Sequence, residues 1–144
     1  MGAVRTDTLR GKRDAAMLGL LLGCGLRRSE VANLEIERIQ RRDGHWAIVD
    51  LVGKAGHVRT VPVPLWVKTA IDSWSSAAGI SEGRLFRAIR KNGVLWGRGV
   101  TQNVVWYVVK KSATRAGIDK LAPHDLRRSC ARMCHGAGGE IEQI

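Results

Sequence analysis

The sequence has few acidic residues, few cysteines and no long apolar run. Its 144 residues include 13 Asp and Glu against 24 Lys and Arg, which gives a formal net charge of +11. Such an excess of positive charge favours a polyanion as the partner, and nucleic acid is the first candidate. A basic protein without such a partner is the alternative that the charge alone leaves open.

The three cysteines do not form a metal-site pattern. Cys24, Cys130 and Cys134 make an odd number, which is typical of reduced thiols in an intracellular protein. Cys130, Cys134 and His135 lie close together, but no second ligand pair occurs elsewhere, so we interpret them as core residues. The apolar stretch at residues 14–24 is too short to span a bilayer, and no signal-peptide cleavage pattern is present.

Apolar residues at helical spacing predict two helices in the first part of the chain. In residues 14–24 they fall on one face, which predicts a buried core helix that glycines bring to an end. Ser29 is the predicted cap of a second helix that turns Val31 and Leu34 inward. Arg27 would then lie just outside the N-terminus of that helix, where free backbone N–H groups also favour an anion.

The middle of the chain changes from helical spacing to alternation. Residues 46–52 and 58–63 are predicted to be antiparallel strands around a turn that carries Lys54, and residues 85–89 are a possible third strand. An amphipathic helix from Pro64 through Trp74 follows the second strand. The chain is long enough for one domain with its own core.

The apolar run at residues 104–109 supports two interpretations. Its β-branched and aromatic residues favour a strand, whereas its context favours a helix over residues 101–116, which we prefer. The only tyrosine, Tyr107, lies in this run, and its apolar neighbours predict a buried or half-buried ring. We therefore expect a mainly α protein with a small antiparallel β-sheet, an α+β fold, after a linker at residues 1–12.

A histidine and an arginine near the end of the chain suggest phosphate chemistry. His124 and Arg127 share one face of a predicted helix, so a titratable group and a cationic fork lie side by side. Most pairs with this spacing are merely solvated. Two earlier segments add cations in a compatible order, with Arg27 in residues 25–31 and Lys54 in residues 53–62.

These three segments resemble the boxes of the catalytic domain of the tyrosine recombinase (phage integrase) family. Gly-Leu-Arg-Arg-Ser-Glu-Val at residues 25–31 resembles the first arginine box, with Arg27 at the catalytic position. The Gly-Lys-Ala-Gly segment that begins at residue 53 resembles the hairpin with the catalytic lysine, Lys54. Pro-His-Asp-Leu-Arg-Arg-Ser at residues 123–129 resembles the His-x-x-Arg box.

The sequence departs from the family pattern at both ends. Family members carry a histidine or tryptophan and then the nucleophilic tyrosine after the His-x-x-Arg box, and the sequence ends before both positions. They also usually carry a helical DNA-clamping domain ahead of the catalytic domain. We therefore expect residues 13–144 to be a partial catalytic domain that lacks its C-terminal segment and is inactive alone.

The resemblance implies DNA cleavage and rejoining through a 3′-phosphotyrosyl intermediate, with no metal or other cofactor. Arg27 and Arg127 would hold the non-bridging oxygens of the reacting phosphate, and Lys54 would protonate the leaving 5′-oxygen. His124 would bond the phosphate or relay a proton. Glu30 would orient His124 or Arg27 without contacting the phosphate itself.

The resemblance also implies partners and a location. Double-stranded DNA is the expected substrate, and the surplus cations Arg28, Arg59 and Arg128 are expected to bind it. The full-length protein is expected to be a homotetramer on DNA, without a membrane or metal partner, in the cytoplasm with the nucleoid. A non-catalytic DNA-binding remnant or inhibitor of recombination is the alternative.

A basic RNA-binding domain is a further alternative, from a different class. It accounts for the charge but makes the three boxes a coincidence. It is disfavoured because Trp66, Trp74 and Trp106 have the spacing of core residues and not that of an exposed stacking platform.

Overall fold

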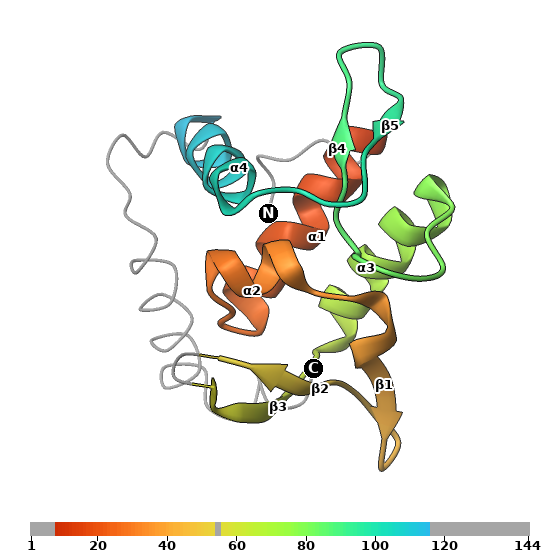
Figure 1. Ribbon diagram of the computed structural model, residues 1–144, viewed down its shortest axis with the longest axis vertical. Coiled ribbons are helices and arrows are strands. Elements are labelled where there is room, and N and C mark those ends of the chain that lie inside the picture. Colours follow the sequence, from red (N-terminus) through yellow and green to blue (C-terminus); the bar gives the residue numbers. More distant parts are fainter. Residues whose placement is uncertain (1–7, 54–55, 116–144) are drawn as a thin grey trace.

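The protein has the expected α+β architecture. The structure, a computed structural model, describes residues 8–53 and 56–115. In chain order the elements are α1 (Leu9–Gly23), α2 (Arg28–Asn33), the short 3-10 helix η1 (Ile36–Arg38), β1 (Ile39–Arg42), β2 (His45–Val52), β3 (Val58–Pro62), α3 (Leu65–Ala78), β4 (Ala88–Ile89), β5 (Leu95–Trp96) and α4 (Gln102–Arg115). Figure 1 shows α1 at the centre, with α3 and α4 on either side of it and the sheet below α2.

The central helix α1 begins earlier than the apolar pattern predicted. Thr8 caps it, because its Oγ1 accepts a hydrogen bond from the N–H of Gly11 at 3.0 Å, so the helix starts at Leu9 and not at residue 14. The apolar pattern did not include the first turn because that turn contains basic residues. One of them, Arg13, is nevertheless buried beside Asp14, with 3.2 Å between Arg13 Nε and Asp14 Oδ1.

The sheet has three antiparallel strands in the order β1-β2-β3. The two strands predicted at residues 46–52 and 58–63 are confirmed as β2 and β3. The prediction of a possible third strand at residues 85–89 was wrong. Only Ala88 and Ile89 of this segment form a strand, and they pair with β5 in a separate hairpin. The third strand is β1, whose Ile-Gln-Arg-Arg sequence shows no apolar alternation because it lies at the partly exposed edge of the sheet.

Helix α3 covers the core beside α1 and is longer than predicted. It continues beyond Trp74 through Ser75 to Ala78 and is capped by Gly79, which has a left-handed φ of 70°. Trp74 is fully buried, and its Nε1 donates a hydrogen bond to the carbonyl oxygen of Leu85 at 2.8 Å. This bond fixes the segment that leads to the β4–β5 hairpin.

The segment at residues 104–109 is helical, which confirms the preferred interpretation. In α4 the buried residues are Val105, Val108 and Val109, at the spacing of one helix face. Tyr107 lies on another face and is 66% exposed, so its predicted burial was wrong. Trp106 is half-buried.

Among the described residues, no helix has both the length and the apolarity that a membrane crossing requires.

Candidate phosphate-binding site

Arg27 occupies the turn that connects α1 to α2. The preceding residue, Leu26, is fully buried and anchors this turn in the core. Arg27 is itself the N-cap of α2, so the prediction that Ser29 would cap the helix was wrong. The carboxylate Oε1 of Glu30 accepts a hydrogen bond from the backbone N–H of Arg27 at 2.7 Å. The arginine backbone is therefore held in place while its side chain is half-exposed.

Glu30 also binds Arg59, which lies on β3. The guanidinium donates two hydrogen bonds, from Nη1 to Oε2 at 2.7 Å and from Nη2 to Oε1 at 3.0 Å. The side chain of Glu30 is 4% exposed and that of Arg59 is 39% exposed, so the guanidinium of Arg59 covers the carboxylate from the solvent side. One carboxylate thus joins the arginine turn to the lysine-bearing hairpin.

The pKa values of the pair agree with this geometry. Burial would by itself raise the pKa of the Glu30 carboxyl, but hydrogen bonds from Arg59 and from the Arg27 backbone outweigh burial and bring the pKa below its ordinary value. The hydrogen bonds to Glu30 raise the pKa of Arg59. Both groups therefore stay charged at neutral pH.

A glycine lets the ion pair lie against the base of the hairpin. A Cβ atom at Gly53 would be 2.8 Å from Arg59 Nη1 and 3.4 Å from Glu30 Oε2. The Gly53 N–H donates to the carbonyl oxygen of His57 at 2.7 Å, which closes the turn. Lys54, the next residue and the predicted general acid, lies outside the described residues.

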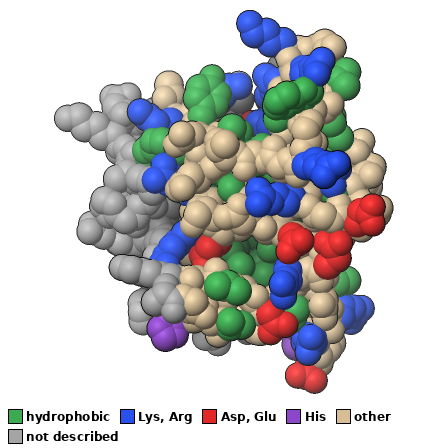
Figure 2. Space-filling view, in the orientation of Figure 1, with side chains coloured by type: hydrophobic (Ala, Val, Ile, Leu, Met, Phe, Trp, Pro, Cys, Tyr) green, Lys and Arg blue, Asp and Glu red, His purple; other side chains and the backbone are tan. Residues whose placement is uncertain are grey.

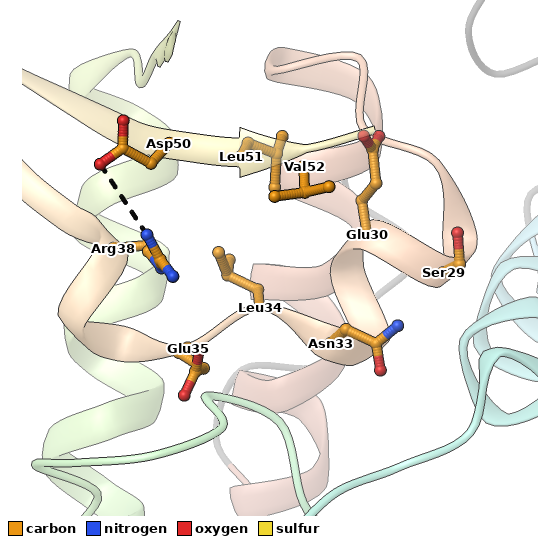
Figure 3. A pocket seen from close by; sticks show the side chains of 9 residues that line it. All are labelled: Ser29, Glu30, Asn33, Leu34, Glu35, Arg38, Asp50, Leu51 and Val52. Atoms are coloured by element: carbon orange, nitrogen blue, oxygen red, sulfur yellow. Dashed lines mark ion pairs between the residues drawn. The ribbon is translucent and has the colours of Figure 1, made fainter. Parts of the chain in front are cut away.

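A cavity of about 210 Å³ lies on the other side of Glu30, between α2, η1 and β2. Figure 3 shows Glu30 at one end and the Arg38–Asp50 ion pair at the other, with Leu34, Leu51 and Val52 between them. The ion pair is open, with 3.9 Å between Arg38 Nη1 and Asp50 Oδ2. Asp50 has a φ of 51° at an irregular point in the pairing of β2 with β3.

Cations and carboxylates are unevenly distributed over the surface. In Figure 2 most of the acidic side chains gather in one part of the face shown, whereas lysines and arginines spread over the whole face. Three exposed acids, Glu35, Glu37 and Glu82, line one open hollow together with arginines. Within the part of the chain that the structure describes, no group of three or more His, Cys, Asp or Glu side chains is arranged to hold a metal ion.

The structure brings together three of the residues predicted for the site: Arg27, Glu30 and Arg59. It shows Arg28 on the first turn of α2, with its guanidinium 5.6 Å from the centre of the Trp106 ring. The remaining predicted residues, His124, Arg127 and Arg128, lie outside the described residues, as do Cys130 and Cys134. Their roles stay predictions.

The Glu30–Arg59 pair was not predicted from the sequence, although one signal was available. Along β3, Arg59 and Val61 alternate with exposed residues, so the strand period of two turns both toward the same half-buried face. An arginine on that face needs a carboxylate partner. Nothing in the sequence identifies Glu30 as the partner, because 29 residues separate the two.

Comparison with known proteins identifies the family of the chain. The sequence matches the phage integrase family over residues 1–144. It is 33% identical over 138 residues to tyrosine recombinase XerD of Shewanella oneidensis. The aligned region covers 92% of this chain and 44% of that protein. It is also 33% identical over 149 residues to tyrosine recombinase XerC of Myxococcus xanthus, and this region covers 95% of this chain and 46% of that protein.

Solved structures show the same fold at low sequence identity. XerH site-specific recombinase bound to palindromic difH substrate, in a post-cleavage complex, matches with a TM-score of 0.70 and 17% identity, covering 93% of this chain and 37% of that chain. XerA recombinase matches with a TM-score of 0.59 and 18% identity, covering 90% and 49%. The chain belongs to the phage integrase family, and it spans less than half the length of these curated relatives.

Proposed function

We propose that this chain is the phosphate-binding part of a tyrosine recombinase catalytic domain that acts on duplex DNA. The arrangement of Arg27 carries the proposal, because a buried carboxylate fixes its backbone. Within the described ranges, its guanidinium donates no hydrogen bond and forms no ion pair. An arginine fork on a fixed backbone, with no hydrogen-bond partner among the described residues, suits a phosphodiester oxygen. The relatives named tyrosine recombinases and the XerH complex with difH substrate support DNA as the ligand.

The proposed reaction needs the residues outside the described ranges as well. In the complete protein, a tyrosine oxygen attacks the phosphorus, and the bond from phosphorus to the 5′-oxygen breaks. Arg27 and Arg127 stabilise the extra charge on the non-bridging oxygens. Lys54 gives its proton to the leaving 5′-oxygen, and His124 bonds the phosphate or relays the proton of the nucleophile. The complete protein acts as a homotetramer on DNA.

A second candidate function is DNA binding without cleavage. The 144 residues contain one tyrosine, Tyr107, which precedes the His-x-x-Arg box and lies on an exposed face of α4. This chain by itself would then occupy a recombination site and inhibit recombination by full-length relatives.

Salt-dependent binding to a fluorescent DNA duplex tests the proposal. We expect the logarithm of the binding constant to fall linearly with the logarithm of the salt concentration, by about 0.9 for each phosphate neutralised. Arg27→Gln should weaken binding and reduce this slope by about one. Arg42→Gln, which removes an exposed arginine from β1, is the matched control. Equal losses in both variants, or tighter binding to an RNA of the same length, would overturn the proposal.

A further inference from the structure

Two cations lie beside one indole ring where α2 meets α4. The guanidinium carbon of Arg28 lies 5.6 Å from the centre of the Trp106 ring, and Nζ of Lys110 lies 5.9 Å from the same centre. Trp106 and Lys110 are one turn apart on α4, so they share a face of that helix. Lys110 is exposed, whereas Arg28 and Trp106 are half-buried.

Neither cation has an acidic partner in the described part of the chain. The ion pairs described there involve Arg13, Arg38, Arg59 and Lys68. The acid nearest to Arg28 in sequence, Glu30, already binds Arg59. The ring attracts each cation weakly, but it does not neutralise either charge. Among the described residues, the two positive charges around this ring therefore lack a counter-ion.

A second tryptophan in the same protein provides the comparison. Trp46 also has two cations beside its ring, Arg41 at 5.8 Å and Lys68 at 3.9 Å. There, however, Lys68 forms an ion pair with Asp72 on the same helix. The Trp46 cluster thus carries its own carboxylate, and the Trp106 cluster among the described residues does not.

Arg28 is adjacent to Arg27, but the two side chains serve different positions. Arg27 is the extended cap residue of α2, and Arg28 is the first residue of the helix, so successive side chains diverge. A backbone phosphate held by Arg28 would therefore not be the phosphate held by Arg27. It would be another phosphate of the same duplex.

We infer that Arg28 and Lys110, held by the Trp106 ring, form a second binding site for a backbone phosphate of duplex DNA, separate from the site of Arg27. This inference rests on the proposed function. The site is a docking site and not part of the reaction, because it contributes charge at a distance from the reacting phosphate. Trp106 is a positioning residue that keeps both cations at the α2–α4 junction.

Salt titrations of duplex binding distinguish this role from simple helix packing. Arg28→Gln and Lys110→Gln should each reduce the salt slope by about one. Trp106→Leu should also reduce it, although it removes no charge, and Trp106→Phe should restore most of the slope. Arg41→Gln, which removes a cation from the other tryptophan, should leave the slope unchanged.

The outcomes distinguish simple helix packing, failure of this inference and failure of the proposed function. If the Trp106→Leu protein is less stable but keeps the wild-type slope, the cluster only packs the helices and the inference is wrong. If Trp106→Leu does not fold, the exposed Lys110 still decides, because Lys110→Gln with a wild-type slope overturns the inference. Loss of all duplex binding in the wild-type chain would overturn the proposed function as well, whereas wild-type binding with unaffected variants overturns this inference alone.

Discussion

Arg59 holds both oxygens of the Glu30 carboxylate, at 2.7 and 3.0 Å, and that carboxylate holds the backbone N–H of Arg27. The start of α2 and strand β3 therefore meet at one acidic group that is almost completely buried. This contact lies against Gly53 at the base of the hairpin, and Lys54 follows Gly53 in the sequence. The backbone of Arg27 is thus linked through Glu30 to Arg59 on β3.

The first prediction concerns the strength of this ion pair. Arg59→Leu leaves a buried carboxylate with only a backbone donor, and we expect it to lower the free energy of unfolding by about 1–3 kcal/mol, less than for a fully buried pair because Arg59 is partly exposed. Arg38→Leu is the matched control, because it breaks the open, exposed pair with Asp50. Its cost should be about 0–1 kcal/mol. Urea unfolding measures both, and equal costs would contradict the prediction.

The second prediction concerns acid. The pKa of Glu30 is lower in the folded protein than its ordinary value of 4.5, so ionised Glu30 contributes stability above that pH. The contribution is lost as the pH falls through the folded pKa. Glu30→Gln should therefore be less stable than the wild type at pH 7, and the difference should shrink below pH 4.5. Thermal unfolding from pH 7 to pH 3 measures it, and parallel curves at every pH would refute the assignment.

The local patterns in the sequence predicted the elements that bury one clear face. The strands β2 and β3 alternate, and α3 and α4 carry apolar residues at helical spacing, so each was found without tertiary information. Strand β1 was not found because Gln40 and Arg41 give it no apolar face. Tyr107 was misplaced because its neighbours in sequence are apolar, although the helical spacing of Val105, Val108 and Val109 turns Tyr107 outward.

The candidate site was only partly accessible from the sequence. Arg27 and Glu30 are three residues apart, and their motif was recognisable. The partner of Glu30 was not, because the pairing with Arg59 depends on how β3 packs against α2 across 29 residues. The Trp106 cluster is hidden for the same reason, since Arg28 and Trp106 meet only when α2 and α4 pack together.

The third prediction concerns the contact between α1 and α3. A Cβ atom at Gly23 would lie 2.6 Å from Val67 Cγ2 and 2.8 Å from Trp66 Cζ2. Gly23→Ala should therefore force the helices apart and cost about 1–3 kcal/mol of stability. At Gly19 the nearest atom, Val67 Cγ1, would be 3.4 Å away. Gly19→Ala should change stability by less than about 1 kcal/mol because a better helix propensity offsets slight crowding. A larger loss for Gly19→Ala in urea unfolding would show that the helix contact is misassigned.

The last prediction is that the 144-residue chain forms no covalent adduct with DNA. Its tyrosine, Tyr107, lines a hollow with Arg10, Asp14 and Ile89, between the start of α1 and β4. The neighbouring Trp106 instead faces Arg28 on α2, and successive residues on a helix point about 100° apart. The phenol of Tyr107 is therefore directed away from the side of α4 that adjoins the arginine turn.

A nicked duplex that traps a 3′-phosphoprotein, followed by a denaturing gel, measures the adduct. We expect none from the chain, and none from Tyr107→Phe. Adding the C-terminal segment of a XerD relative that carries a tyrosine should produce an adduct that Arg27→Gln removes, because the transition-state charge then lacks its arginine. An adduct from the 144 residues that disappears in Tyr107→Phe would show that Tyr107 reaches the phosphate and is the nucleophile.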